Sequence, residues 1–147
     1  MRIIALIMLL FVGGCNQIGE NHPDKEVTGE MSKGVVLSVE PVQKQGKVEF
    51  NMSVKNNTDK TVEFHFNSGQ KFELTVVDEK GNEVYRYSEG KVFTQVLETM
   101  KLKPGESYDF KDVWTSVPGP GKYSVNVTFL GRAELSTLQE RKTFTVK

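Results

Sequence analysis

The sequence predicts an all-β protein, an immunoglobulin-like antiparallel β-sandwich of seven to eight strands, and three observations carry this prediction. The composition holds 19 Val, 11 Thr and 9 Phe but only 2 Ala, and β-branched and aromatic residues suit a pleated, half-buried surface better than a helix. Apolar and polar residues alternate with a period of two from Gly34 onward. Turn-forming residues interrupt this alternation about every 8–18 residues, as expected for an antiparallel sandwich.

The alternation defines individual strands. It is clearest in residues 48–54, where Val48, Phe50, Met52 and Val54 alternate with polar residues, and it recurs in residues 62–66, 72–76, 123–129 and 144–146. In the second of these segments Phe64 and Phe66 share one phase and His65 has the other, so we expect the two phenylalanines to face the core and His65 to face solvent.

One further strand has an ambiguous phase. It begins with Tyr108 and Phe110, but Val113 then falls out of phase while Trp114 stays in phase. Two explanations remain open at this point: Asp112 lies at the rim of the sheet, or a bulge absorbs one residue.

Turn chemistry separates the strands, in residues 56–59, 78–81, 88–90, 103–106 and 118–121. The segment after the last of these turns, Gly121-Lys122-Tyr123-Ser124-Val125, resembles the tyrosine corner of immunoglobulin-like domains, with Val125 where the second disulfide cysteine would stand. The alternative is a strand that merely begins with tyrosine.

The first 14 residues form a separate segment, which we expect to be a lipoprotein signal peptide. Arg2 precedes an apolar run from Ile3 to Val12 that is too short for a transmembrane helix but fits a signal-peptide core. The run leads into Val12-Gly13-Gly14-Cys15, which resembles the lipobox of bacterial lipoproteins. Because Cys15 is the only cysteine, we expect it to be lipidated and to anchor the protein to the cell membrane on the extracytoplasmic side. A plain secretory signal with an incidental cysteine is the alternative.

We expect residues 15–33 to be the lipidated cysteine and a flexible tether, and residues 34–147 to be the sandwich domain. The tether holds only three larger apolar residues, Ile18, Val27 and Met31. Its root-mean-square reach is about 25 Å, which would hold the domain just off the membrane.

Charge and residue content argue against several functions. Lys+Arg and Asp+Glu are both 19, so no basic excess exists to neutralise nucleic-acid phosphates. With Cys15 lipidated, His22 and His65 leave no His/Cys cluster for a metal. No segment resembles a nucleophile elbow. We therefore expect no enzymatic activity, no cofactor, no metal and no nucleic-acid partner, and we expect a monomer.

Five groups of residues occur in an order and spacing that resemble the BsuPI-type intracellular proteinase inhibitor family. They lie between about Val48 and Val127 and comprise residues 54–58, 68–73, 78–88, 93–95 and 102–106. The resemblance implies a sandwich fold and a proteinase as the partner. The resemblance suggests a serine protease as the target, and because an exported chain meets proteases only outside the cytoplasm, we expect that target to be extracytoplasmic. The alternative is a non-inhibitory immunoglobulin-like module that binds a protein or a glycan at the cell surface.

Six residues are the predicted partner-binding surface: Tyr85, Arg86, Tyr87, Ser88, Glu89 and Lys91. Tyrosine and arginine are favoured anchors of protein interfaces. The alternative for this segment is a hairpin turn with core aromatics. The stiffest loop by composition is Pro118–Gly121. Gln70 and Gln95 lie close to aromatic residues, and we expect both to be buried amides that pair with the backbone.

Overall fold

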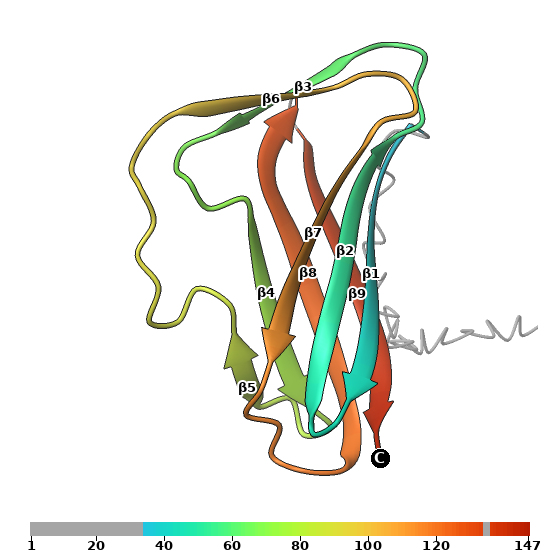
Figure 1. The fold of residues 1–147 in the computed structure, drawn as a ribbon, viewed down its shortest axis with the longest axis vertical. Helices are drawn as coiled ribbons and strands as arrows, with labels where there is room; N and C mark the ends of the chain where they lie inside the picture. The colour runs from blue at the N-terminus through green and yellow to red at the C-terminus, as the bar shows by residue number, and fades with distance from the viewer. Residues whose placement is uncertain (1–33, 134–135) are drawn as a thin grey trace, which may run out of the picture.

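The structure, a computed structural model, describes residues 34–133 and 136–147, which form two antiparallel sheets packed face to face (Figure 1). The predicted signal peptide, Cys15 and the tether lie outside the described residues. The described residues contain strands and turns without any helix, so the all-β sandwich is confirmed. Accordingly, they include no helix that could cross a membrane.

Nine strands make up the described part of the chain, where the sequence predicted seven to eight. They are β1 (Val35–Lys44), β2 (Lys47–Asn56), β3 (Val62–Phe66), β4 (Phe72–Asp78), β5 (Glu83–Arg86), β6 (Glu98–Leu102), β7 (Ser107–Trp114), β8 (Gly121–Ala133) and β9 (Ser136–Val146). The alternation did not single out β1, β5 and β6 as individual strands. Of these, β5 and β6 are edge strands of 4 and 5 residues, too short to show a clear alternation.

The strands form a smaller and a larger sheet. The smaller sheet has the order β1-β2-β7, and the larger has the order β5-β4-β8-β3-β6, with β9 also paired to β8. The 13-residue strand β8 organises the larger sheet. It pairs with β4 and β9 along most of its length and with β3 through Arg132 opposite His65.

The core lies between the sheets and follows the predicted alternation. Phe64 and Phe66 are 2% and 1% exposed, whereas His65 is exposed, so the predicted phase of β3 is confirmed. Rings from the two sheets meet across the interior: Trp114 packs edge-on against Tyr123 at 5.2 Å between ring centroids, and Phe110 lies 4.8 Å from Phe72.

The phase of β7 is resolved without a bulge. The register between β2 and β7 runs unbroken from Lys55 opposite Ser107 to Val48 opposite Trp114. Asp112 therefore holds an inward-facing position next to the fully buried Trp114. The unbroken register excludes the bulge, and the side chain of Asp112 stays 12% exposed.

The predicted tyrosine corner is present at the start of β8. The hydroxyl of Tyr123 donates a hydrogen bond of 2.8 Å to the carbonyl oxygen of Gly119, four residues upstream. This is the backbone contact that defines the corner. Val125, two residues after Tyr123, is fully buried. The turn after β7 is thus tied to the strand that follows.

Candidate functional site

The connection between β5 and β6 leaves the sandwich and runs along its outer side (Figure 1). Its second part, residues 91–97, belongs to no strand, and we call these residues the arm. The arm carries Val92, Val96 and Leu97, which are 98%, 56% and 79% exposed. In the part of the chain that the structure describes, the other exposed large apolar side chain is Val36 on β1. Exposed apolar surface is therefore concentrated on the arm.

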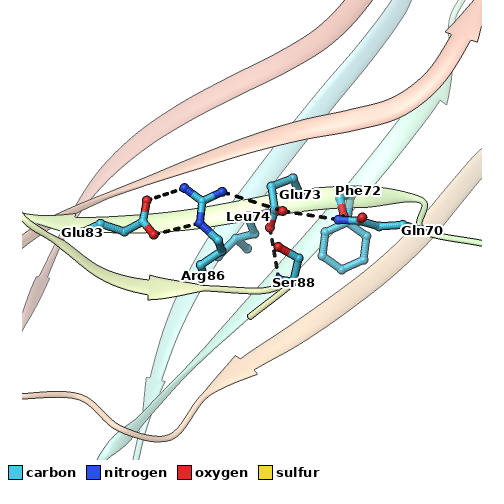
Figure 2. A network of polar contacts seen from close by, with 7 residues as sticks. All are labelled: Gln70, Phe72, Glu73, Leu74, Glu83, Arg86 and Ser88. Atoms are coloured by element: carbon cyan, nitrogen blue, oxygen red, sulfur yellow. Dashed lines mark hydrogen bonds and ion pairs between the residues drawn. The ribbon is translucent and has the colours of Figure 1, made fainter. Parts of the chain in front are cut away.

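The turn that precedes the arm, residues 87–90, is held on β4 by Glu73 (Figure 2). One carboxylate oxygen of Glu73 accepts hydrogen bonds from the backbone N–H groups of Leu74 and Ser88, at 3.0 and 3.2 Å. The backbone N–H of Tyr87 also donates to the carbonyl oxygen of Leu74 at 2.8 Å. Two of these bonds, from Ser88 and Tyr87, join the turn to β4 and fix the point from which the arm departs.

Tyr85 connects the base of the arm to the other sheet. Its hydroxyl donates a hydrogen bond of 2.6 Å to a carboxylate oxygen of Asp112 on β7, and its ring stacks on Trp114 at 6.0 Å. Burial and the bond to Asp112 together raise the pKa of the Tyr85 hydroxyl well above its usual value. Tyr85 is therefore a neutral hydrogen-bond donor that connects the larger sheet to the smaller one.

Lys91, the first residue of the arm, contacts the ring of Tyr87 and the carboxylate of Asp112. Its ammonium nitrogen lies 3.6 Å from the centroid of the Tyr87 ring and 3.9 Å from the carboxylate of Asp112. The Tyr87 ring packs in turn on Phe72 at 4.2 Å and on Phe93 at 6.0 Å. Burial raises the pKa of Tyr87 as well. One half of the arm is thus attached to the sandwich through aromatic and charged contacts.

The other half of the arm is attached to the β3–β4 connection, residues 67–71. The backbone N–H of Gly69 donates a hydrogen bond of 2.8 Å to the carbonyl oxygen of Thr94. Lys71 forms an ion pair with Glu98, the residue that follows the arm. A Cβ atom on Gly69 would lie 2.5 Å from the hydroxyl oxygen of Thr94, so the close approach of the two segments favours glycine there.

The structure brings the six predicted partner-binding residues together at the base of the arm. Arg86 uses its guanidinium within the chain, because it donates to both oxygens of Glu83 at 2.8 and 2.5 Å (Figure 2). Tyr85, Tyr87 and Ser88 are half-buried, and Glu89 and Lys91 are exposed. Their role in binding remains a prediction, and in the structure they support the arm beside them.

The sequence reasoning missed Val92, Val96 and Leu97. Each apolar residue of the arm has an apolar neighbour, in the pairs 92–93 and 96–97, and these pairs do not follow the period of two that marks a strand. In a chain that otherwise alternates, these adjacent apolar pairs were the available signal that residues 92–97 do not form a regular strand.

Other predicted positions have different outcomes. Gln70 donates from its side-chain amide to the carbonyl oxygen of Phe72 at 2.9 Å and is half-buried, which confirms its backbone pairing. Gln95 pairs with the carbonyl oxygen of Phe93 at 3.3 Å but is exposed, so its predicted burial is wrong: the arm stands off the sandwich. Residues 34–133 and 136–147 hold no group of three His, Cys, Asp or Glu suited to a metal ion.

Parts of three solved structures are similar to this chain at low sequence identity. A β-glucuronidase of Bacteroides uniformis is 18% identical with a TM-score of 0.42, over 81% of this chain and 14% of that chain. A penta-heme cytochrome c552 from Thermochromatium tepidum is 8% identical with a TM-score of 0.45, over 75% of this chain and 40% of that chain. R. palustris CsgH is 10% identical with a TM-score of 0.38, over 73% of this chain and 89% of that one.

No curated protein sequence matches the chain. A family model does match, over residues 35–134, and its description is BsuPI, intracellular proteinase inhibitor. The match runs from the first residue of β1 through the end of β8, and so includes the smaller sheet, the larger sheet except β9, the arm and the β3–β4 connection that supports the arm. The chain therefore belongs to the BsuPI family of intracellular proteinase inhibitors.

Proposed function

We propose that this chain inhibits a serine protease outside the cytoplasm, and that the arm is the surface that contacts the enzyme. Membership of a proteinase inhibitor family supports the class of partner. The observation that carries the proposal is the exposure of Val92, Val96 and Leu97 on a segment attached to the sandwich at several points. Exposed apolar side chains gathered in one place favour association with a partner protein.

The attachment of the arm favours tight binding. Ordering a flexible loop on association costs conformational entropy, and a loop that is already ordered avoids much of this cost. The tethers at Lys91, Thr94 and Glu98 fix the arm before it meets a partner. Burial of each Val or Leu side chain then contributes up to about 1.5–3 kcal/mol.

The location of the inhibitor follows from the N-terminal segment. A lipid anchor on Cys15 would hold the domain outside the cytoplasm, even though the family is named for intracellular inhibitors. A lipid on Cys15 with two acyl chains would give stable anchoring, whereas a single acyl chain gives only reversible membrane binding. The inhibitor would then act on proteases at or near the membrane surface.

Inhibition assays with the full chain in mild detergent test the proposal. We expect inhibition of at least one secreted serine protease with a Kd of about 1 μM or lower. Replacing Val92, Val96 and Leu97 together by serine should weaken inhibition by at least about tenfold, or about 1.4 kcal/mol. The control is Val36→Ser, which changes the exposed apolar residue of β1 and should have no effect. Absence of inhibition across exported proteases would leave the non-inhibitory binding module.

A further inference from the structure

We infer that Leu97 enters the primary specificity pocket of the target protease and that this pocket is apolar. This inference rests on the proposed function, because it specifies how the arm would contact the enzyme. It assigns Leu97 as the specificity-determining residue, the Leu97–Glu98 peptide bond as the bond placed at the catalytic serine, and the β3–β4 connection as the support of both sides of that bond.

Leu97 is favoured because of its surroundings on the chain. Residues 95–99 are all exposed, and Glu98 begins β6, which is the last strand of its sheet and has one unpaired edge in the described structure. Proteins commonly bind an extended segment by adding it to the edge of a sheet. A protease could therefore pair with the chain on both sides of Leu97.

Val92 is less suited to this role although it is 98% exposed. Both of its neighbours in the chain contact the sandwich: Lys91 lies against Tyr87 and Asp112, and Phe93 packs on the Tyr87 ring. A protease that placed Val92 in its pocket would have to displace these contacts. The branched Cβ of valine also restricts its χ1 rotamers, whereas leucine is a longer side chain that reaches further into a slot.

The two sides of the Leu97–Glu98 bond are attached to the same short segment. Thr94 accepts the hydrogen bond from Gly69, and Glu98 forms its ion pair with Lys71. Hydrolysis would add one water to the bond and leave a carboxylate on Leu97 and an ammonium group on Glu98. Because residues 67–71 would hold both new ends, the ends would stay close together and resealing, with loss of that water, would compete with release. The arm should therefore occupy the enzyme without being consumed quickly.

A charge swap tests the identity of the pocket residue. The full chain and its Leu97→Lys and Val92→Lys variants are assayed against proteases with an apolar pocket, of chymotrypsin and subtilisin type, and against trypsin, whose pocket is acidic. We expect the unmodified chain to inhibit the first group. Leu97→Lys should weaken that inhibition by about a hundredfold, because an unpaired charge is costly in an apolar pocket, and should create inhibition of trypsin. Val92→Lys removes one apolar contact of the arm, so it should weaken inhibition of the first group less than Leu97→Lys does and should create no inhibition of trypsin.

The outcomes separate this inference from the proposed function. A switch produced by Val92→Lys alone would overturn the assignment of Leu97 while leaving inhibition by the arm intact. An unmodified chain that inhibits trypsin alone would overturn the apolar pocket. Failure to inhibit any of these enzymes or any exported protease would instead overturn the proposed function.

A second measurement tests the tethers. Lys71→Met removes the ion pair with Glu98. Lys101→Met is the matched control, because Lys101 on β6 forms a 2.9 Å ion pair with Glu63 on the neighbouring strand β3. With excess protease, cleavage between Leu97 and Glu98, followed by mass spectrometry, should be about tenfold faster for Lys71→Met than for Lys101→Met. Equal cleavage rates, or a main cleavage site elsewhere in the arm, would contradict the role of the β3–β4 connection.

Discussion

The hydroxyl of Tyr85 donates a hydrogen bond of 2.6 Å to the carboxylate of Asp112, and this bond joins β5 in the larger sheet to β7 in the smaller sheet. Lys91, the first residue of the arm, approaches the other oxygen of the same carboxylate at 3.9 Å. Asp112 thus connects the packing of the two sheets with the position of the arm. A polar residue occupies an inward-facing position here because it has two partners.

This relationship predicts how stability depends on pH. The pKa of Tyr85 is raised in the folded state by burial and by Asp112, so ionisation of this hydroxyl favours the unfolded chain. Its contribution to the free energy of unfolding is fully present below the unfolded pKa of about 10 and is lost as the pH rises above it. We expect Tyr85→Phe to be less stable than the unmodified chain near neutral pH, by about 1.5–3 kcal/mol, because the lost bond involves a charged acceptor.

Urea unfolding at about pH 7 and about pH 11 measures this effect. The stability difference between the two proteins should shrink as the pH rises. Tyr87, whose pKa is also raised by burial, remains in the variant, so some alkaline destabilisation should persist. A stability difference that stays constant over this range would show that the Tyr85 hydroxyl does not sense the folded environment.

Much of the fold could be predicted from the sequence because strand alternation is a local property. The inward phase of Phe64 and Phe66 follows from their immediate neighbours, and the tyrosine corner at Tyr123 involves a residue only four positions away. The short strands β5 and β6 could not be predicted well, because pairing with β4 and β3 defines them and their own alternation does not.

The candidate site was harder to predict because long-range contacts create it. Val92 and Phe93 are adjacent apolar residues, yet Val92 is exposed while Phe93 is half-buried against Tyr87. Likewise, the bond between Thr94 and Gly69 joins residues of two separate connections. Local sequence does not distinguish a buried from an exposed apolar residue outside a regular strand. The predicted partner-binding residues therefore ended at Lys91, just before the exposed apolar residues of the arm.

Asn56 should be important for stability although it is polar. Its side chain is fully buried, donates to the carbonyl oxygens of Lys60 and Leu102 at 2.8 Å each, and accepts hydrogen bonds from the backbone N–H and the hydroxyl of Thr58 at 2.9 and 2.7 Å. Asn56→Ala would leave these partners unsatisfied, at a cost of about 2–4 kcal/mol in the free energy of unfolding.

The neighbouring residue provides the control for this prediction. Asn57 is exposed, so Asn57→Ala should change stability by less than about 0.5 kcal/mol. Both variants are compared in urea at neutral pH. A loss of stability below about 0.5 kcal/mol in Asn56→Ala as well would mean that the turn after β2 tolerates the loss of the buried amide.

The phase of β3 makes a matched pair of predictions. Phe64 packs edge-on against Phe129 at 5.2 Å between ring centroids and is 2% exposed, so Phe64→Ala should destabilise the protein by about 3–5 kcal/mol. His65, which points to solvent from the next position, should tolerate alanine at a cost below about 0.5 kcal/mol. Reversed magnitudes in denaturant unfolding would place the strand one residue out of register.

The last prediction concerns membrane attachment through Cys15, which lies outside the described residues. If the thiol accepts the lipid, Cys15→Ser should abolish labelling by a fatty-acid analogue and leave the protein either uncleaved or released from the membrane, because serine lacks the thiol nucleophile. Gln17→Ser, two residues further along, is the control and should be processed and anchored normally. Membrane fractionation and the mass of the mature N-terminus measure both effects. Normal processing and membrane retention of Cys15→Ser would show that lipidation does not anchor this chain, and the target of the proposed inhibition would then have to be sought away from the membrane surface.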